Sequence, residues 1–415
     1  MKRISGWTEL SNLPDEVKDL ILLSLPVKTV LRFRCVIRDY LRFHNPNFIK
    51  MHLNRQIEIH DDASTTIVIA TAYKVYKADL GTLGNPIRID LPFLNPTSSC
   101  PIRLLGSCNG LLCLTHWARD RYIVYLWNPA TGEYKQLPGH NNHKKHYIVL
   151  GFGYDHTSGK FKVLAFSYDA VKNTKEVFVY TLGTSSWRSI GEFQFPRELT
   201  WQTWQVFEGC PHWIMTGLKS IVIFSVGNEN FKDIPMPPID IATTRSHLTA
   251  LGGRLSIYCY VSNLKRHELW VRVNDGLEHT WTKHLSFNDS VIPGYLNGYI
   301  DKTVVWGFKN GQLLLGHKGP SLFDPVTGDV KALYLPGHPK YFKVYSYIES
   351  LAMLNVEDRV DVHQNSLNGV KTYREQTICG IHGTTARTTR DGRRNRTVAD
   401  NIKPDPLLVI KNANR

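Results

Sequence analysis

The chain has 415 residues and a formal net charge of +14, with 42% hydrophobic and 21% charged residues. This length allows two or three domains with a sizeable core, and the composition is that of an ordinary globular protein. The excess positive charge is spread over the head, the middle and the tail of the sequence, whereas nucleic-acid binders gather charge on one face. We therefore expect no nucleic-acid partner. No run approaches the ~20 apolar residues of a membrane span.

Residues 13–53 have the pattern of three short helices. Pro14 suits the first position of a helix, Leu25-Pro26 ends that helix and starts the next, and Asn45-Pro46 begins the third. A head of about 40 residues rarely supports an independent core. Because Leu20–Leu23 is nevertheless an unbroken apolar run, part of this surface should pack against the rest of the chain or against a partner.

Four segments of this head follow one another in a recognisable order: Leu13–Glu16, Ile21–Lys28, Leu31–Val36 and Asn45–Phe48. Together they resemble the F-box of plant F-box proteins. That resemblance implies docking onto a Skp-type adaptor, which links the protein to a cullin scaffold. The family usually has a Trp where this chain has Tyr40, and the stretch from Tyr40 to Pro46 is one residue shorter than usual. The adaptor contacts that the resemblance implies are Leu13, Pro14, Ile21, Leu25, Pro26, Leu31, Val36 and Tyr40.

A hairpin pattern recurs through the middle of the chain. Each copy has an apolar pair, a turn with Gly, Asn or Pro, and in most copies an aromatic residue about seven positions on, then a basic residue. The leading aromatic residues are 44 to 53 residues apart, which is the period of four-stranded, kelch-like propeller blades. The leading aromatic residues are Tyr76, Trp127, Tyr180, Phe224, Trp270 and Phe323. Further residues that mark the repeats are Gly110, Pro129, Gly132, Trp187, Phe231, Gly311 and Pro325.

The recurring hairpins predict a six-bladed kelch-like β-propeller. A second apolar run precedes most of them and should form a buried inner strand. The segment Phe342–Leu354 follows the sixth copy and should pair with the first blade and close the ring, which would remove the open sheet edges. A two-sheet β-sandwich-like domain is the alternative, because regular strands do not by themselves require radial symmetry.

Several segments also resemble the F-box-associated domain of plant F-box proteins, namely Gly106–Leu111, Trp127–Gly132, Gly151–Asp155 and Tyr347–Leu351. The resemblance implies a substrate-recognition subunit of a Skp–cullin–F-box ubiquitin ligase. Its partners would be the adaptor, through it a cullin–RING ligase, and an unknown protein substrate. The alternative is an F-box-containing scaffold that binds proteins without the ligase. We expect an F-box over residues 8–54, a β domain over 58–355 and a basic, largely disordered tail over 356–415.

Nothing in the sequence indicates a catalytic centre. The seven cysteines include no Cys-x-x-Cys pair, and no phosphate-binding loop or nucleophile elbow is present. His140, His143 and His146 recur every three residues, but two lysines between them argue against a metal ion. We therefore expect a non-catalytic protein with no cofactor and no metal. Because the N-terminus has no apolar stretch of a signal peptide, we expect it in the cytoplasm, the nucleus or both.

Overall fold

The computed structural model describes seventeen segments of the chain. They are residues 13–33, 42–59, 66–79, 86–95, 101–118, 121–139, 146–169, 174–192, 204–215, 220–240, 244–251, 254–274, 279–291, 303–307, 311–316, 320–336 and 342–354. The predicted tail over 356–415 lies outside these segments. So do two of the predicted adaptor contacts, Val36 and Tyr40.

Three α-helices form the N-terminal head, as the sequence predicts. They are α2 (Asp15–Ser24), α3 (Val27–Phe33) and α4 (Pro46–Ile59), with a short 3-10 helix η1 (Arg42–His44) before α4. Each begins beside a proline: the Pro14 carbonyl accepts the first amides of α2, and the Pro26 carbonyl accepts those of α3. Pro has no amide to leave unsatisfied at a helix start. Helix α4 continues to Ile59, beyond the expected end of the head.

The β domain consists of six four-stranded antiparallel units, listed here from the first to the fourth strand of each blade. Blade 1 has β24 (Phe342–Ser346), β1 (Thr66–Thr71), β2 (Val75–Asp79) and β3 (Ile87–Ile89). Blade 2 has β4 (Ile102–Cys108), β5 (Leu111–Ala118), β6 (Arg121–Trp127) and β7 (Tyr134–Gln136). Blade 3 has β8 (His146–Asp155), β9 (Lys160–Asp169), β10 (Thr174–Thr181) and β11 (Arg188–Glu192). Blade 4 has β12 (Trp204–Phe207), β13 (Cys210–Met215), β14 (Ser220–Ser225) and β15 (Asn230–Pro235). Blade 5 has β16 (Thr244–Leu251), β17 (Arg254–Val261), β18 (Arg266–Asn274) and β19 (His279–Asn288). Blade 6 has β20 (Thr303–Gly307), β21 (Leu313–Gly316), β22 (Pro320–Phe323) and β23 (Val330–Ala332). Two 3-10 turns, η4 (Ser262–Leu264) and η5 (Asp289–Val291), complete the set.

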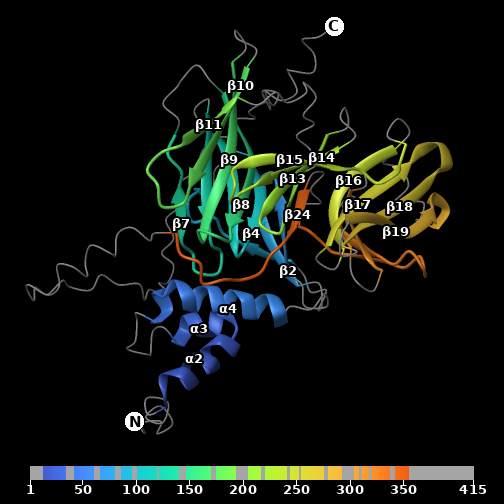
Figure 1. Cartoon of the computed structure of the whole chain (residues 1–415). Coiled ribbons are helices and arrows are strands. Elements are labelled where there is room, and N and C mark those ends of the chain that lie inside the picture. The colour runs from blue at the N-terminus through green and yellow to red at the C-terminus, as the bar shows by residue number, and fades with distance from the viewer. Residues whose placement is uncertain are drawn as a thin grey trace, which may run out of the picture. The chain divides into compact units, whose positions relative to one another are not determined.

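The first strands of neighbouring blades lie against one another around a closed ring. Strand β24 contacts β4, β4 contacts β8, and β8 contacts β12; the ring continues from β12 to β16, then β20, and returns to β24. Between blades 5 and 6 the contact includes one parallel bridge, Leu251 to Gly307. A two-sheet sandwich has no such cycle, so the prediction of a six-bladed β-propeller is confirmed and the sandwich alternative is excluded (Figure 1).

The last strand of the chain closes the first blade. Strand β24 pairs antiparallel with β1, in a register that runs from Ile67 opposite Ser346 to Thr71 opposite Phe342. The closing strand is shorter than the predicted 342–354. After Ser346 the chain leaves the sheet, and Figure 1 shows it passing, in orange-red, between the sheets and helix α4. We call residues 347–354 the junction segment.

The six predicted hairpins are the third and fourth strands of the blades. In the turn after β6, the Asn128 side-chain oxygen accepts the amides of Ala130 and Thr131, and Gly132 has a φ of 78°. The apolar runs that precede the hairpins are the second strands of the blades and not the innermost ones. The innermost position belongs to a separate strand, such as β4, which the sequence pattern left unassigned.

Large apolar side chains fill the spaces between blades. One cluster joins blades 2, 3 and 4 around Phe152 and Phe224, and another joins blades 1 and 2 around Trp127. Two indole groups add bonds between neighbouring blades: Trp187 Nε1 donates to the Pro138 carbonyl at 2.8 Å, and Trp281 Nε1 donates to that of Pro235 at 2.9 Å.

Candidate protein-interaction surfaces

One face of helix α2 exposes apolar side chains to solvent. Leu20 is 68% exposed, Val17 38% and Ile21 37%, whereas Leu22 and Leu23 are buried inside the head. Residues three and four positions apart share one side of a helix, so Val17, Leu20 and Ile21 form a continuous stripe. Apolar side chains on a small helical head are costly to expose, and such a stripe is typical of a protein-binding surface.

The predicted adaptor contacts fall partly on this stripe. Ile21, Pro14 and Pro26 are exposed, and Leu13, Leu25 and Leu31 are half-buried. Two residues of the stripe are not among the predicted adaptor contacts: Val17 and Leu20, the most exposed of the apolar residues on the helix. Helical periodicity could have found both, because positions 17, 20 and 21 lie on one side of the helix.

A buried histidine holds the end of α2 against α4. His52 is fully buried, and its Nε2 lies 2.9 Å from the Leu25 carbonyl, with Gln56 Nε2 at 3.4 Å from the same oxygen. The ring nitrogen must donate, because a carbonyl can only accept. Burial lowers the pKa of His52, and the bond to Leu25 offsets part of that effect. The side chain is therefore neutral at pH 7 and satisfies a helix-terminal carbonyl.

The junction segment contributes to the head as well as to the propeller. Leu351 is buried among Leu23, Val30, Phe48 and other apolar residues of the head. Three positions further, Leu354 is buried in the cluster that joins blades 2, 3 and 4. One short segment therefore supplies side chains to two separate cores.

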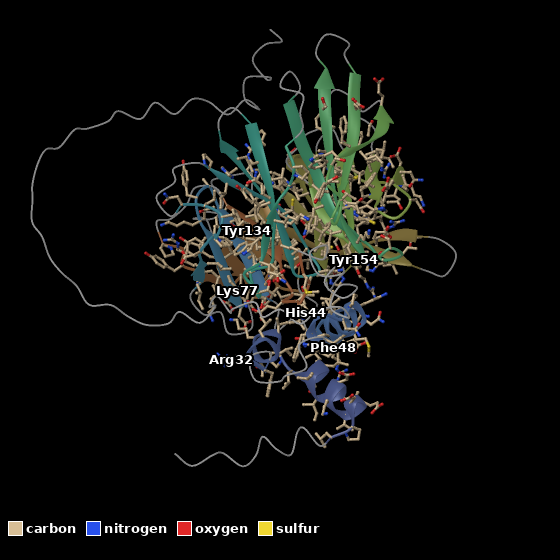
Figure 2. All side chains as sticks on the ribbon, turned by 90° about the vertical axis from the view of Figure 1, so that its left-hand side faces the viewer. Arg32, His44, Phe48, Lys77, Tyr134 and Tyr154 are labelled. Carbon is tan, nitrogen blue, oxygen red and sulfur yellow. The ribbon has the colours of Figure 1, made fainter. Side chains whose placement is uncertain are left out.

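Charged groups accompany this apolar contact. Glu349 forms an ion pair with Lys77 of β2, and Lys28 of helix α3 lies 4.0 Å from the same carboxylate. Figure 2 shows Lys77 at the end of the sheets that faces the helices carrying Phe48. Glu349 thus lies between one cation from the propeller and one from the head.

Hydrogen bonds between side chains and backbone groups hold the junction segment against blade 2. The Asn128 side-chain amide donates to the carbonyls of Ser350 at 3.0 Å and Ala352 at 2.8 Å. The Ser350 hydroxyl donates to the Asn109 carbonyl at 2.8 Å, and the Leu354 amide donates to the Glu133 carboxylate at 3.1 Å. Since Asn128 and Ser350 are fully buried, these bonds are formed away from competing water.

Gly110 is required where blade 2 meets the junction segment. Its φ is 81°, and a Cβ there would lie 2.1 Å from the Ser350 Oγ and 2.9 Å from the Ser350 amide nitrogen. Any other residue would combine backbone strain with a collision. The motif Ser107-Cys108-Asn109-Gly110 thus allows close approach between two segments far apart in sequence.

The other residues expected to mark the repeats have packing roles. Trp127 and Phe323 are almost fully buried, Pro325 is buried, and Pro129, Trp187 and Phe231 are partly buried. Gly132 and Gly311 have φ values of 78° and 87°, the left-handed conformation that tight turns require.

The motif Gly151–Asp155 joins blades 3 and 4. A Cβ on Gly153 would lie 2.1 Å from the Gly209 carbonyl, and the Tyr154 amide donates to that carbonyl at 2.9 Å. Burial alone would raise the pKa of Asp155, but hydrogen bonds from Ser158, Thr157 and Lys162 outweigh it and hold the pKa at about 2. The ionised carboxylate pairs with buried Lys162 at 3.2 Å. This charged group is structural, because both members are enclosed by the two blades.

Three of the four cysteine thiols in the described segments, those of Cys108, Cys113 and Cys259, are unsuited to nucleophilic catalysis. Burial raises the pKa of Cys108 and Cys259 to about 12 and that of Cys113 further. A reactive cysteine needs a lowered pKa and access to solvent. Nor do the described residues include a cluster of three side chains that could ligate a metal, or a helix long and apolar enough to cross a membrane. His140 and His143 lie outside these segments.

The fold and the exposed stripe define a class: a closed six-bladed β-propeller that carries a helical head with an exposed apolar face. The family model described as the F-box associated beta propeller domain matches residues 88–315. The chain belongs to the plant F-box proteins that contain an F-box-associated domain.

Relatives from Arabidopsis thaliana match over most of the chain. F-box protein At3g07870 is 24% identical, over 83% of this chain and 92% of its own length. F-box/kelch-repeat protein At3g23880 is 24% identical, over 77% of this chain and 92% of its own length. F-box protein CPR1 is 25% identical, over 66% of this chain and 72% of its own length. The predicted membership of this family is confirmed.

Proposed function

We propose that the protein is the substrate-recognition subunit of a Skp–cullin–F-box ubiquitin ligase. The observation that carries this proposal is the apolar stripe of Val17, Leu20 and Ile21, which the head leaves uncovered although the next two residues of the same helix, Leu22 and Leu23, are buried. Burying one such side chain against a partner contributes about 1.5–3 kcal/mol. The names of the relatives, which are F-box proteins, point to the same partner class.

In this proposal the chain acts by positioning and carries no catalytic group. The head binds the adaptor, and the propeller holds a target protein so that the target's lysines reach a separately bound ubiquitin-conjugating enzyme. Rate enhancement then comes from effective concentration and orientation. The cytoplasm and the nucleus are the proposed compartments.

Co-purification with a Skp-type adaptor tests the adaptor contact directly. Leu20→Glu should weaken binding at least about 30-fold, because a loss of about 2 kcal/mol of apolar burial corresponds to that factor. Val326→Glu is the matched control, since Val326 is 86% exposed on a turn of blade 6. Binding that survives Leu20→Glu, or that both variants weaken equally, would refute the proposal.

The alternative function is a protein-binding scaffold that acts without the ligase. It predicts that the chain fails to bring down a cullin even when the adaptor is in excess. Tyr40, which stands where the family has Trp, is the residue to test here, and Tyr40→Trp should tighten adaptor binding if the ring lies in the interface.

We also propose that the chain divides into three parts: an F-box over residues 8–54, a propeller over 58–355 and a tail over 356–415. Limited proteolysis should cleave first among Arg387–Arg396 and leave 342–354 protected. Resistance of the tail to protease would place the boundary elsewhere.

A further inference from the structure

Three aromatic rings meet where the outer part of blade 1 joins blade 2. Phe93 follows β3, the outer strand of blade 1. Its ring stacks on that of Tyr125 in β6, with 4.3 Å between the ring centroids and 16° between the ring planes. The Tyr134 ring of β7 lies 5.4 Å from Phe93, measured between centroids. Blade 2 and the chain that leads into it therefore share one aromatic cluster.

Strand register brings an amide side chain to these rings. Tyr134 and Gln136 lie two positions apart on β7 and so share one side of blade 2, opposite Trp127 and Tyr125 of β6. Tyr125 is buried, whereas Tyr134 is 42% exposed and Gln136 is exposed as well. A fixed, buried ring thus supports groups that reach the surface. We call Phe93, Tyr125, Tyr134 and Gln136 the rim cluster.

The polar groups of the rim cluster have donors to offer. The Tyr125 hydroxyl donates to the Gln136 side-chain oxygen at 3.3 Å, so what Gln136 has left is its NH₂ group, which can only donate. Burial raises the pKa of Tyr125, which keeps the proton on this hydroxyl. Within the described residues no acceptor bonds to the Gln136 NH₂ group, nor to the indole N–H of Trp127, which is buried edge-on to Phe93.

A ligand that suits this surface needs flat apolar groups for the rings and free acceptors for the donors. A polyproline II segment has both, because it forms no internal hydrogen bonds and its proline rings dock on aromatic side chains. A helical ligand fits less well, since most of its carbonyls are already bonded within the helix. Strand addition also fits poorly, because β7 has only three residues, Tyr134–Gln136.

We propose that the rim cluster binds a proline-rich segment of the target protein in the polyproline II conformation. This inference rests on the proposed function, and it names the substrate class. Proline rings pack against Phe93 and Tyr134, while the Gln136 NH₂ group and the Tyr134 hydroxyl donate to the carbonyls of the segment. Figure 2 shows Tyr134 farther up the sheets from the helices than Lys77. The rim cluster shares no residue with the α2 stripe, so target and adaptor have separate sites.

Fluorescence anisotropy on the full chain tests the proposal with labelled decaproline, compared with a labelled Gly/Ser peptide of the same length. Decaproline should bind more tightly. Tyr134→Ala should weaken its binding about tenfold or more, because the change removes a ring and a donor. Gln136→Glu should weaken it about fivefold, since Glu still accepts the bond from Tyr125 but cannot donate.

The matched control is Tyr73→Ala, which removes a tyrosine that is 56% exposed in the turn between β1 and β2, outside the rim cluster. Its effect should stay below about twofold. Equal binding of the two peptides, or equal losses in Tyr134→Ala and Tyr73→Ala, would overturn the proposal. Tighter binding of maltoheptaose than of decaproline, lost in Tyr134→Ala, would identify a sugar site and overturn it too. Adaptor binding is measured separately and should be unchanged in both rim variants, so failure of the adaptor contact does not mimic failure at the rim cluster.

Discussion

Asn128 and Asp324 occupy equivalent positions in the turns after β6 and β22, and only the first of them faces the junction segment. Both side chains accept two backbone amides through Oδ1, those of residues 130 and 131 in one turn and 326 and 327 in the other. Asn128 alone uses its second side-chain atom to donate, to the carbonyls of Ser350 and Ala352. A carboxylate cannot donate there, so we expect Asn128→Asp to be destabilising although it preserves size and shape.

The magnitude follows from the burial of the site. Asn128 is fully buried, so the substitution leaves two buried carbonyls without a donor, at about 1–3 kcal/mol each, and places a charge beside them. We expect a loss of about 4 kcal/mol in the free energy of unfolding at pH 7, a large part of a typical stability of about 5–15 kcal/mol. At about 2 °C per kcal/mol, the melting temperature should fall by about 8 °C.

Urea unfolding followed by tryptophan fluorescence, together with thermal melts, measures both quantities. Asp324→Asn is the matched control, because Asn retains the acceptor oxygen and Asp324 is only partly buried. Its cost should stay below about 1 kcal/mol. The reasoning is wrong if Asn128→Asp lowers the free energy of unfolding by less than about 1 kcal/mol, or by no more than Asp324→Asn does. Either result would show that the hydrogen bonds from Asn128 to the junction segment contribute little to stability.

Three other changes test the junction and the head. Leu351→Ala should remove about 2–5 kcal/mol from the head and weaken adaptor binding, whereas Leu354→Ala should lower the melting temperature of the propeller; similar effects of both on adaptor binding would contradict the assignment to two cores. Gly110→Ala should cost clearly more than Gly132→Ala, which shares the positive φ but has open space around the added Cβ, and equal melting temperatures would show that close approach is unimportant. The pKa of His52 is lowered in the folded head, so its contribution is present above its unfolded value of about 6.5 and is lost as pH falls below it. Stability measured from pH 7.5 to 5.5, about a unit on either side, should drop less in His52→Gln than in the unaltered chain.

The propeller could be predicted from the sequence because its hairpins repeat. The turn residues and the regular spacing of the leading aromatic residues, such as Trp127 and Phe323, identify the third and fourth strands of most blades. This identification needs no knowledge of the contacts between blades. The innermost strands could not be found in the same way. Strands β4, β8 and β20 each contain a register shift, and a shift breaks the two-residue alternation by which a strand is recognised.

The apolar run Leu20–Leu23 shows a second limit. All four positions are equally apolar in sequence, yet Leu22 and Leu23 are buried and Leu20 is exposed. Which side of α2 faces inward depends on α4 and on Leu351, more than 320 positions later in the chain. The junction segment was predicted to be strand for the same reason, because an apolar stretch after β24 has no local signal for leaving the sheet.

The course of the junction segment bears on how the proposed ligase subunit could position its target. A head joined to a propeller only through the chain between α4 and β1 would hold the target at an orientation set by a single connection, and flexible connections dilute effective concentration. Leu351 and Glu349 provide a second, non-covalent connection, made from the residues that directly follow the ring-closing strand. Because these residues directly follow β24, their position against blade 2 and in the head is linked to the pairing of β24 with β1 that closes the ring. A chain whose propeller had not closed would lack Leu351 in the head, and the exposed apolar stripe of α2 would rest on a core with a missing side chain.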